Sequence, residues 1–174
     1  MTLADPADFV DLVRRHDRTL RALAWRLLGD RDRMDDVLQE AYVKAFRALP
    51  TFRGDAEAAP GTWLYRITYN ACMDELRRQR RVSLVPLDDA VGRPDPRGDV
   101  GDRVVRSHRL AAAIDALPPD HRAAVLLVDA EGFDYASAAD ALGIPEGTVR
   151  SRLSRARARL RAALGEEGKE ERHA

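Results

Sequence analysis

Arginines dominate two stretches of this 174-residue chain. Residues 147–164 contain six arginines and no acid, and residues 77–81 read Arg-Arg-Gln-Arg-Arg. The guanidinium group is planar, always charged and rich in N–H donors, so it binds phosphate oxygens and the edges of bases. Because the 29 basic and 29 acidic residues of the chain cancel, the local gathering of positive charge carries the information, and the net charge does not. The chemistry that these stretches favour is the binding of a nucleic acid.

The first of these stretches, residues 147–164, falls on a predicted helix with two distinct sides. At 100° per residue, its buried stripe consists of Val149, Leu153, Ala156, Leu160 and Leu164. The opposite side and its edges hold six candidate DNA contacts: Arg150, Ser151, Ser154, Arg155, Arg157 and Arg159. A short helix predicted over 135–142 and a glycine turn precede it, which is a helix-turn-helix arrangement. A slim polar side edged with arginines fits a major groove, whereas a solvated helix of a bundle is the alternative interpretation.

A second candidate surface lies on a helix predicted from Thr62, as its cap, to about Arg81. One arc of this helix is apolar and includes Leu64 and Cys72. The other side carries seven candidate DNA contacts: Trp63, Arg66, Asn70, Arg77, Arg78, Arg80 and Arg81. An aromatic ring, an amide and guanidinium groups on one ridge can stack on unpaired bases, bond to base edges and hold the backbone. The alternative is that Trp63 belongs to the core and the arginines only keep a surface helix soluble.

A third surface has the opposite charge. In a helix predicted to start at Asp32, its cap, and to end before Pro50, the residues Asp36, Gln39 and Glu40 lie together away from the apolar side. Such a face usually serves solubility. In a protein with two DNA-binding surfaces, it can also dock on a basic protein, and both interpretations stay open.

The sequence contains no recognisable catalytic constellation. The four histidines are scattered with no His-x-x-x-His pair, no glycine-rich phosphate loop follows a strand, and the single cysteine excludes an intrachain disulfide or a multi-cysteine zinc site. No apolar run approaches the ~18 residues of a membrane span, and no signal segment follows Met1. We therefore expect a cytoplasmic protein that is not an enzyme and needs no cofactor or metal.

The elements that position these surfaces are helical. Apolar residues recur with a helical period from Pro6 onward, and no run alternates convincingly with period two. Residues 83–104 contain prolines, glycines and scattered acids, which is typical of a linker. Beyond it, helices are predicted up to Leu117, over about 120–131, over 135–142 and after Pro145. We expect an all-α chain of two small helical domains, joined by a flexible linker that contains proline and glycine.

Four segments resemble the signature segments of the extracytoplasmic-function (group 4) sigma factors of bacterial RNA polymerase, within the sigma-70 family. They follow in that family's order and spacing: DDVLQEAYVKAF (35–46), TWLYRITYNACMDELRRQRR (62–81), ALPPDHRAAVLLVDAEGFDY (116–135) and LGIPEGTVRSRLSRARARL (142–160). The resemblance implies a region-two domain at 5–82, a linker at 83–104, a region-four domain with the helix-turn-helix at 105–165 and a charged tail at 166–174.

The resemblance also implies a role for each surface of the region-two domain. The residues Asp36, Gln39 and Glu40 would grip the clamp helices of the polymerase β′ subunit. The loop around Thr51–Ala56, with Trp63 and Asn70, would capture a flipped-out base of the minus-ten promoter element. The backbone of that element would be held by four arginines: Arg77, Arg78, Arg80 and Arg81.

In the region-four domain, the resemblance implies that the minus-thirty-five element is recognised by four residues: Arg150, Ser151, Ser154 and Arg155. The implied partners are core RNA polymerase (β′ clamp helices and β flap), promoter DNA and an anti-sigma factor, with no membrane insertion. The expected function is to bind core polymerase, recognise promoters and open their strands, with energy from binding rather than from ATP. A stand-alone helix-turn-helix regulator and a protein-binding helical adaptor are the alternatives.

Overall fold

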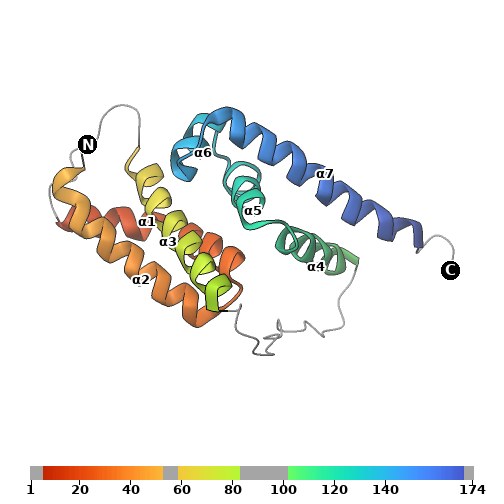
Figure 1. The fold of residues 1–174 in the computed structure, drawn as a ribbon, viewed down its shortest axis with the longest axis horizontal. Coiled ribbons are helices and arrows are strands. Elements are labelled where there is room, and N and C mark those ends of the chain that lie inside the picture. The colour runs from red at the N-terminus through yellow and green to blue at the C-terminus, as the bar shows by residue number, and fades with distance from the viewer. Residues whose placement is uncertain (1–5, 53–58, 83–101, 171–174) are drawn as a thin grey trace.

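A computed structural model describes residues 6–52, 59–82 and 102–170, and every regular element in these ranges is a helix (Figure 1). The elements, in chain order, are α1 (Pro6–Leu28), α2 (Arg31–Ala48), a 3₁₀ turn (Leu49–Thr51), α3 (Pro60–Val82), α4 (Asp102–Asp115), α5 (Pro119–Val125), a π-helical turn (Leu126–Ala130), α6 (Tyr135–Leu142) and α7 (Glu146–Glu170). The prediction of an all-α fold is confirmed.

The first three helices pack around one apolar core. Leu20, Leu38 and Leu64 are almost completely buried, one from each helix, because each sits on the apolar side that the helical period creates. Gly29 has a φ of 69°, which glycine adopts without strain, and it turns the chain between α1 and α2. The carboxylate of Asp30 then accepts from the Arg33 N–H at 3.0 Å and caps α2.

Two predicted helix starts are therefore displaced. The prediction of Asp32 as the cap of α2 is wrong, because Gly29 ends α1 early enough for Asp30, in an extended conformation, to take that position. The helix α3 begins at Pro60, so Thr62 lies in its first turn and is buried. Proline is favoured at the first helical position because its missing N–H would have no partner there.

The remaining helices form a second group in which α7 packs on α4, α5 and α6. Asp134 caps α6 by accepting from the Ser137 N–H at 2.7 Å, and Gly143 ends it with a φ of 65°. Of the predicted stripe on α7, Val149, Leu153 and Ala156 are buried. Leu164 is 37% exposed, against the prediction, because α7 continues past the helices that it packs on (Figure 1).

The boundaries of the second group differ from the predicted ones in two further places. The helix predicted over about 120–131 is divided into α5 and the π-helical turn. The helix α4 begins at Asp102 and so includes the end of the stretch predicted as a linker, while residues 83–101 lie outside the described residues. At the other end, α7 continues to Glu170, into the stretch predicted as a tail.

The two groups of helices contact each other, chiefly through α3 against α6 and α1 against α5. In Figure 1, α3 and α6 face each other across the middle of the molecule, although 52 residues (83–134) separate them in the sequence. This arrangement brings both predicted DNA-binding helices, α3 and α7, into one packed body.

We predict that Leu64→Ala lowers the free energy of unfolding by about 2–5 kcal/mol, because it leaves a cavity where α1, α2 and α3 meet. Urea denaturation followed by circular dichroism measures the change. The matched control is Leu110→Ala on α4, where the side chain is 43% exposed and the expected change is within about 0.5 kcal/mol. Equal losses for the two variants would contradict this description of the core.

Candidate nucleic-acid interface

The helix-turn-helix leaves one side of α7 open. The cap at Asp134 and the turn at Gly143 fix α6 against the start of α7, and Val149 and Leu153 anchor α7 to the core. Among the predicted contacts, Ser154, Arg155 and Arg159 are exposed, whereas Ser151 and Arg157 are half-buried. The polar side predicted from the helical period is thus presented to solvent.

Two arginines of this side are already held by acids. Arg150 pairs with Glu146 one turn earlier, and its guanidinium lies 5.2 Å from the centre of the Tyr135 ring. Arg157 donates two hydrogen bonds to Asp129, from Nε at 3.1 Å and from Nη2 at 2.5 Å, which raises the pKa of Arg157. Arg155, in contrast, has no ion-pair partner in the described part of the chain. Arg150 and Arg157 are therefore pre-oriented, while Arg155 is free to meet a new ligand.

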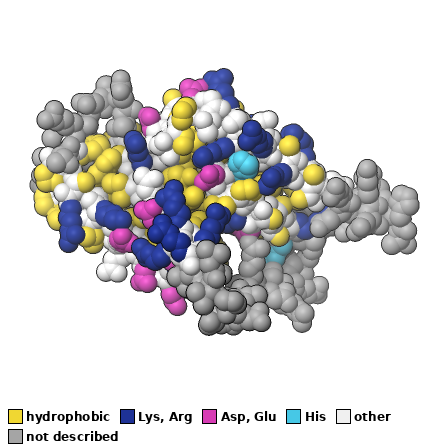
Figure 2. All heavy atoms as spheres, viewed as in Figure 1, with side chains coloured by type: hydrophobic (Ala, Val, Ile, Leu, Met, Phe, Trp, Pro, Cys, Tyr) yellow, Lys and Arg dark blue, Asp and Glu magenta, His cyan; other side chains and the backbone are white. Residues whose placement is uncertain are grey.

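Positive charge extends from α7 over the neighbouring α5. Burial lowers the pKa of His121 on α5, and the nearby positive charges of Arg159, Arg152 and Arg155 lower it further. Beside this region, Arg150, Arg157 and Arg161 surround a hollow of about 400 Å³. Figure 2 shows Lys and Arg side chains over both the α3 side and the α7 side of one face of the molecule. A polyanion is the ligand that such a face attracts.

Arg152 is a residue whose position the sequence did not indicate. On a helical wheel it lies on the flank of α7, where a phosphate contact would be expected, yet its side chain is only 19% exposed. It pairs with Asp120 of α5 at 3.2 Å. Only the long-range packing of α5 against α7 reveals this, because no sequence pattern marks Asp120 as its partner.

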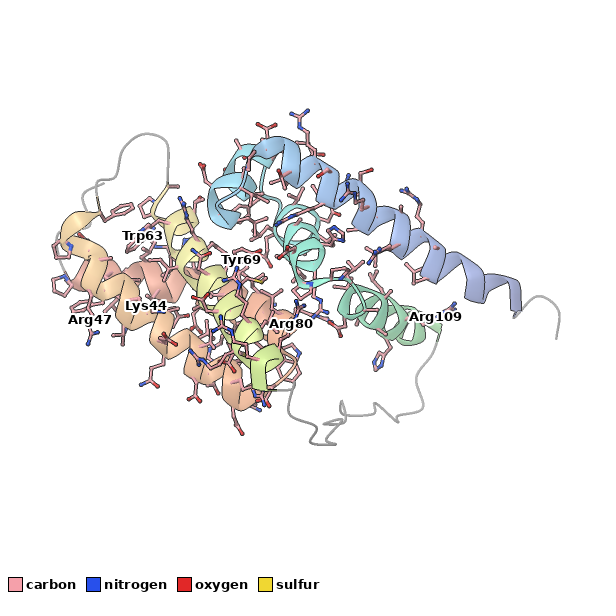
Figure 3. The ribbon with its side chains drawn as sticks, in the orientation of Figure 1. Lys44, Arg47, Trp63, Tyr69, Arg80 and Arg109 are labelled. Atoms are coloured by element: carbon pink, nitrogen blue, oxygen red, sulfur yellow. The ribbon has the colours of Figure 1, made fainter. Side chains whose placement is uncertain are left out.

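On α3, the predicted ridge is exposed along most of its length. The six polar members, Arg66, Asn70, Arg77, Arg78, Arg80 and Arg81, are all exposed. Trp63 is half-buried, because its ring packs on Phe52 with 4.6 Å between ring centres. Figure 3 shows Trp63 at the start of α3 and Arg80 near its end. One side of the Trp63 ring thus packs on the core and the other side is accessible. A role in the core and a role in DNA binding do not exclude each other for this residue.

Two arginines near the end of α3 also have acidic neighbours. Arg77 pairs with Asp74 at 2.7 Å and Arg78 pairs with Glu75 at 2.8 Å. Ion pairs three residues apart on an exposed helix are weak, so a phosphate can displace the carboxylate. Residues 53–58 lie outside the described residues. The role predicted for the loop around Thr51–Ala56 and the DNA-binding roles of the ridge residues stay predictions.

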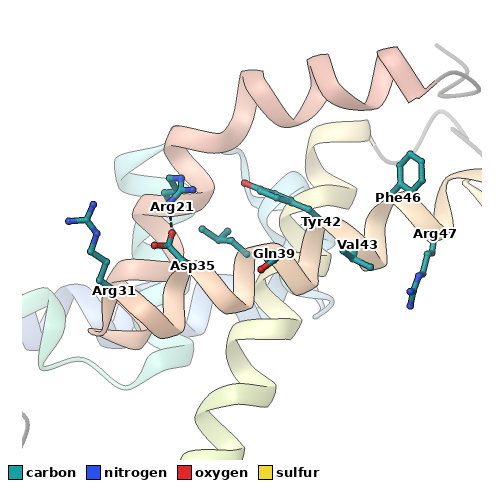
Figure 4. Close-up of a pocket in the computed structure, with 9 residues that line it drawn as sticks. Arg21, Arg31, Asp35, Gln39, Tyr42, Val43, Phe46 and Arg47 are labelled. Atoms are coloured by element: carbon teal, nitrogen blue, oxygen red, sulfur yellow. Dashed lines mark hydrogen bonds and ion pairs between the residues drawn. The ribbon is translucent and has the colours of Figure 1, made fainter.

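A groove of about 740 Å³ lies between α1 and α2 (Figure 4) and is lined by one acid, Asp35, and by three arginines, Arg21, Arg31 and Arg47, besides Gln39 and apolar side chains. Asp36, Gln39 and Glu40 are all exposed; Gln39 lines the groove and Glu40 pairs with Lys44 at 2.7 Å. The sequence did not single out Phe46, which is 49% exposed at the groove, next to Val43 at 43%. Exposed apolar side chains beside acids favour a protein ligand over a nucleic acid.

The described residues contain no group of three or more His, Cys, Asp or Glu side chains that could hold a metal ion. Within the same residues, no helix is long and apolar enough to cross a membrane. Cys72 is buried in the core, which raises the pKa of its thiol to about 12, so the thiol is unreactive near neutral pH. The arrangement can bind nucleic acid and protein through side chains alone.

Comparison with known families gives two matches in the same order along the chain. Residues 12–82 match the family model described as sigma-70 region 2, and residues 107–160 match sigma-70, region 4. These two ranges contain the ridge of α3, the groove of α2 and the helix-turn-helix.

The chain is similar over most of its length to characterised proteins. It is 42% identical over 157 residues to the ECF RNA polymerase sigma factor SigM of Mycobacterium tuberculosis, which covers 90% of this chain and 77% of SigM. The sigma factor RpoE of Bartonella quintana, solved in complex with the anti-sigma factor NepR, superposes with a TM-score of 0.71 at 28% identity, over 91% of this chain and 97% of RpoE. CnrH, solved in complex with the cytosolic domain of CnrY, superposes with a TM-score of 0.66 at 28% identity. The superposition covers 93% of this chain and 90% of the CnrH chain.

We predict that Phe52→Ala shifts the fluorescence emission of Trp63 to longer wavelength, because the indole loses its ring contact and meets more water. The measurement uses a Trp25→Phe background, since Trp25 is the other tryptophan. Phe46→Ala, at the groove of α2, is the control and should leave the emission unchanged. An emission spectrum that Phe52→Ala does not alter would contradict the packing described for Trp63.

Proposed function

The chain belongs to the extracytoplasmic-function group of the sigma-70 family and is an RNA polymerase sigma factor that initiates transcription; from that premise we propose which surface performs each step. The proposed region-two domain covers residues 5–82 and the proposed region-four domain covers residues 105–165, with 83–104 as the linker and 166–174 as the tail. The factor works in the cytoplasm and has no catalytic activity of its own.

Core polymerase docks on α2. The residues Asp36, Gln39 and Glu40 take the β′ clamp helices, and the exposed Val43 and Phe46 extend the contact along the groove. An interface of this kind has an apolar centre and a charged rim, so the acids set orientation while the apolar side chains give most of the affinity. The region-four domain makes the second contact, with the β flap.

The ridge of α3 holds the unpaired strand of the minus-ten element. Unstacking a base costs a few kcal/mol, and stacking it on an aromatic ring returns about 1–3 kcal/mol. The accessible side of Trp63 offers such a ring, Asn70 can bond to a base edge, and the arginines of 77–81 hold the phosphates. The loop around Thr51–Ala56, of which residues 53–56 lie outside the described residues, is proposed to take part in capturing the flipped-out base. Strand opening is thus driven by binding, without ATP.

The side of α7 reads the minus-thirty-five element as duplex. Arg155, which is exposed and has no ion-pair partner in the described ranges, makes the base contact, together with Ser151 and Ser154. Arg150 contacts bases from its position beside Tyr135, and Arg157 and Arg159 contact phosphates. This division between duplex and single strand explains why α3 carries an aromatic ring with one accessible side, Trp63, and the DNA-facing side of α7 carries none.

An anti-sigma factor is the further partner that we propose. The structural neighbour RpoE was solved in complex with the anti-sigma factor NepR, and CnrH was solved in complex with the cytosolic domain of another protein, CnrY. A chain of this kind would cover the exposed apolar residues at the groove of α2, which core polymerase also needs. The two partners would then exclude each other.

One observation chiefly supports this proposal: the two sigma-70 regions are matched in order along the chain. The first region contains the ridge of α3 with its aromatic ring, and the second contains the helix-turn-helix. Pull-down with core polymerase followed by promoter-dependent run-off transcription tests it. We expect stable association and transcripts that require the chain. Specific duplex binding by the free chain, with no stimulation of core polymerase, would favour the stand-alone regulator instead.

Arg155→Ala should lower transcription from promoters that carry a cognate upstream element. The expected loss of promoter-binding free energy is about 1–3 kcal/mol, which is what a bidentate base contact contributes. Run-off transcription from matched and mismatched templates measures the difference. Arg14→Ala, which removes an exposed arginine on α1, is the control. If promoter preference is the same for both variants, Arg155 does not face the groove.

Trp63→Ala and Asn70→Ala should each impair promoter opening while leaving binding to core polymerase intact, since both residues lie on α3 and away from the groove of α2. Opening is followed with a fluorescent base analogue in the minus-ten element, and core binding by pull-down. Loss of both activities together with a loss of helicity in circular dichroism would assign the two residues a structural role.

A further inference from the structure

Tyr135 is the first residue of α6, and the backbone around it is held in place by local structure. Gly132 turns the chain just before it with a φ of 74°, and Asp134 caps α6 by accepting from the Ser137 N–H at 2.7 Å. The Tyr135 ring is half-buried, because it packs against the apolar core. The ring therefore has a defined position, from which its open face and its hydroxyl can meet other side chains.

Two arginines of α7 meet this tyrosine at different atoms. The Arg150 guanidinium lies 5.2 Å from the centre of the Tyr135 ring, which is within the range of a cation–π contact. Arg157 lies within hydrogen-bonding reach of the Tyr135 hydroxyl, which adds to the effect of Asp129 in raising the pKa of Arg157. Seven residues of helix make almost two whole turns and advance by about 10.5 Å, so both arginines leave α7 on the same side. Tyr135 thus lies between two side chains that belong to different turns of α7.

The acidic partners of these two arginines differ from Tyr135 in charge. Glu146 pairs with Arg150, and Asp129 pairs with Arg157. A DNA phosphate that approaches an arginine repels the carboxylate and competes with it for the same N–H donors. A tyrosine is uncharged near neutral pH, so a phosphate does not repel it. Its ring still attracts a cation, and its hydroxyl oxygen can accept one N–H of a guanidinium while the phosphate accepts the others.

The same side chains surround a hollow that is large enough for a phosphate group. The hollow has a volume of about 400 Å³ and is lined by Tyr135, Arg150, Leu153, Ser154, Arg157 and Arg161. Ser154 is exposed, and its small side chain leaves the space between Arg150 and Arg157 open. Arg161 follows Arg157 by one helical turn and adds a third guanidinium. DNA that enters this hollow meets arginines that are in contact with Tyr135.

We propose that Tyr135 is a positioning residue of the DNA-binding side of α7. Its ring directs Arg150 toward the bases and its hydroxyl directs Arg157 toward the backbone, also after DNA has displaced the acids that pair with them. This inference rests on the proposed function, because it concerns the DNA that α7 binds. Ordering a flexible side chain at an interface costs affinity, and an arginine that is already held in its bound direction avoids that cost. Tyr135 has this effect without touching DNA itself.

Two substitutions separate the effect of the hydroxyl from that of the ring. Tyr135→Phe keeps the ring beside Arg150 and loses the hydroxyl beside Arg157. It should lower transcription from matched and mismatched minus-thirty-five elements by the same factor, about fivefold. Tyr135→Leu also loses the ring, so it should in addition lower the ratio of matched to mismatched transcripts about two- to fivefold, because Arg150 is the base contact.

Run-off transcription with core polymerase and each full-length variant, at a polymerase concentration that does not saturate the promoter, measures both quantities. Pull-down with core polymerase and circular dichroism should show no change, which separates a positioning role from a loss of folding. A ratio of matched to mismatched transcripts that Tyr135→Leu leaves unchanged would overturn the role proposed toward Arg150. Unchanged transcription with Tyr135→Phe would overturn the role proposed toward Arg157.

A double substitution tests whether the hydroxyl acts through Arg157 or contacts DNA itself. In an Arg157→Ala background the hydroxyl has no guanidinium to direct, so the addition of Tyr135→Phe should cause no further loss of transcription. A second loss of about fivefold in that background would show a direct contact with DNA and would overturn the positioning role. The matched control is Tyr65→Phe, which removes the hydroxyl of a buried tyrosine on α3 and should leave the ratio of matched to mismatched transcripts unchanged.

Fluorescence anisotropy of a labelled duplex with the minus-thirty-five element, measured with the full-length chain alone, separates this proposal from the function it rests on. If Tyr135→Phe weakens duplex binding about fivefold but transcription does not depend on the chain, the role of Tyr135 stands and the proposed function fails. If transcription depends on the chain but neither substitution of Tyr135 changes duplex binding or transcription, the function stands and this proposal fails.

Discussion

The structure depends on a constraint that α3 and α7 share: each buries one side in the apolar core and leaves another side exposed to solvent. On α3, Leu64 and Cys72 are fully buried, while Asn70 is exposed. On α7, Val149 and Leu153 are buried one or two residues away from exposed arginines. A helical period of 3.6 residues permits this, because it turns each residue by 100° from the one before, so residues one or two apart face different sides of the helix. The packing that stabilises each group therefore also orients the residues that we propose to bind DNA.

The zero net charge of the chain is consistent with this division of surfaces. Several acids lie where they hold arginines in place, as Glu146 does for Arg150 and Asp129 does for Arg157. Others, such as Asp36 and Glu40, are exposed on α2, where we propose that a protein partner binds. Such pairing lowers the positive potential of the free factor. If these arginines bind DNA as we propose, phosphates must displace the acids, so we expect the affinity of the free factor for duplex to be modest and to fall as the salt concentration rises.

Local patterns in the sequence predict the helices and their exposed sides. They do not predict the contacts between residues that lie far apart in the sequence. The helical period and the Gly143 turn predict the helices and the sides of α3 and α7, because those signals lie within a few residues of each other. The start of α2 is missed because Gly29 moves the cap to Asp30. The interface formed by Tyr69, Asp120 and Arg152 is missed entirely, since its members are far apart in sequence and none has a local signature.

The central claim is that one helical group holds separated strands while the other holds intact duplex. Chemical probing of unpaired thymines, combined with nuclease protection, tests it on one promoter complex formed with core polymerase and this factor. The account predicts reactive thymines at the minus-ten element and protected, unreactive duplex at the minus-thirty-five element. Protection of both elements with no reactive thymine, at temperatures where transcripts form, would contradict it.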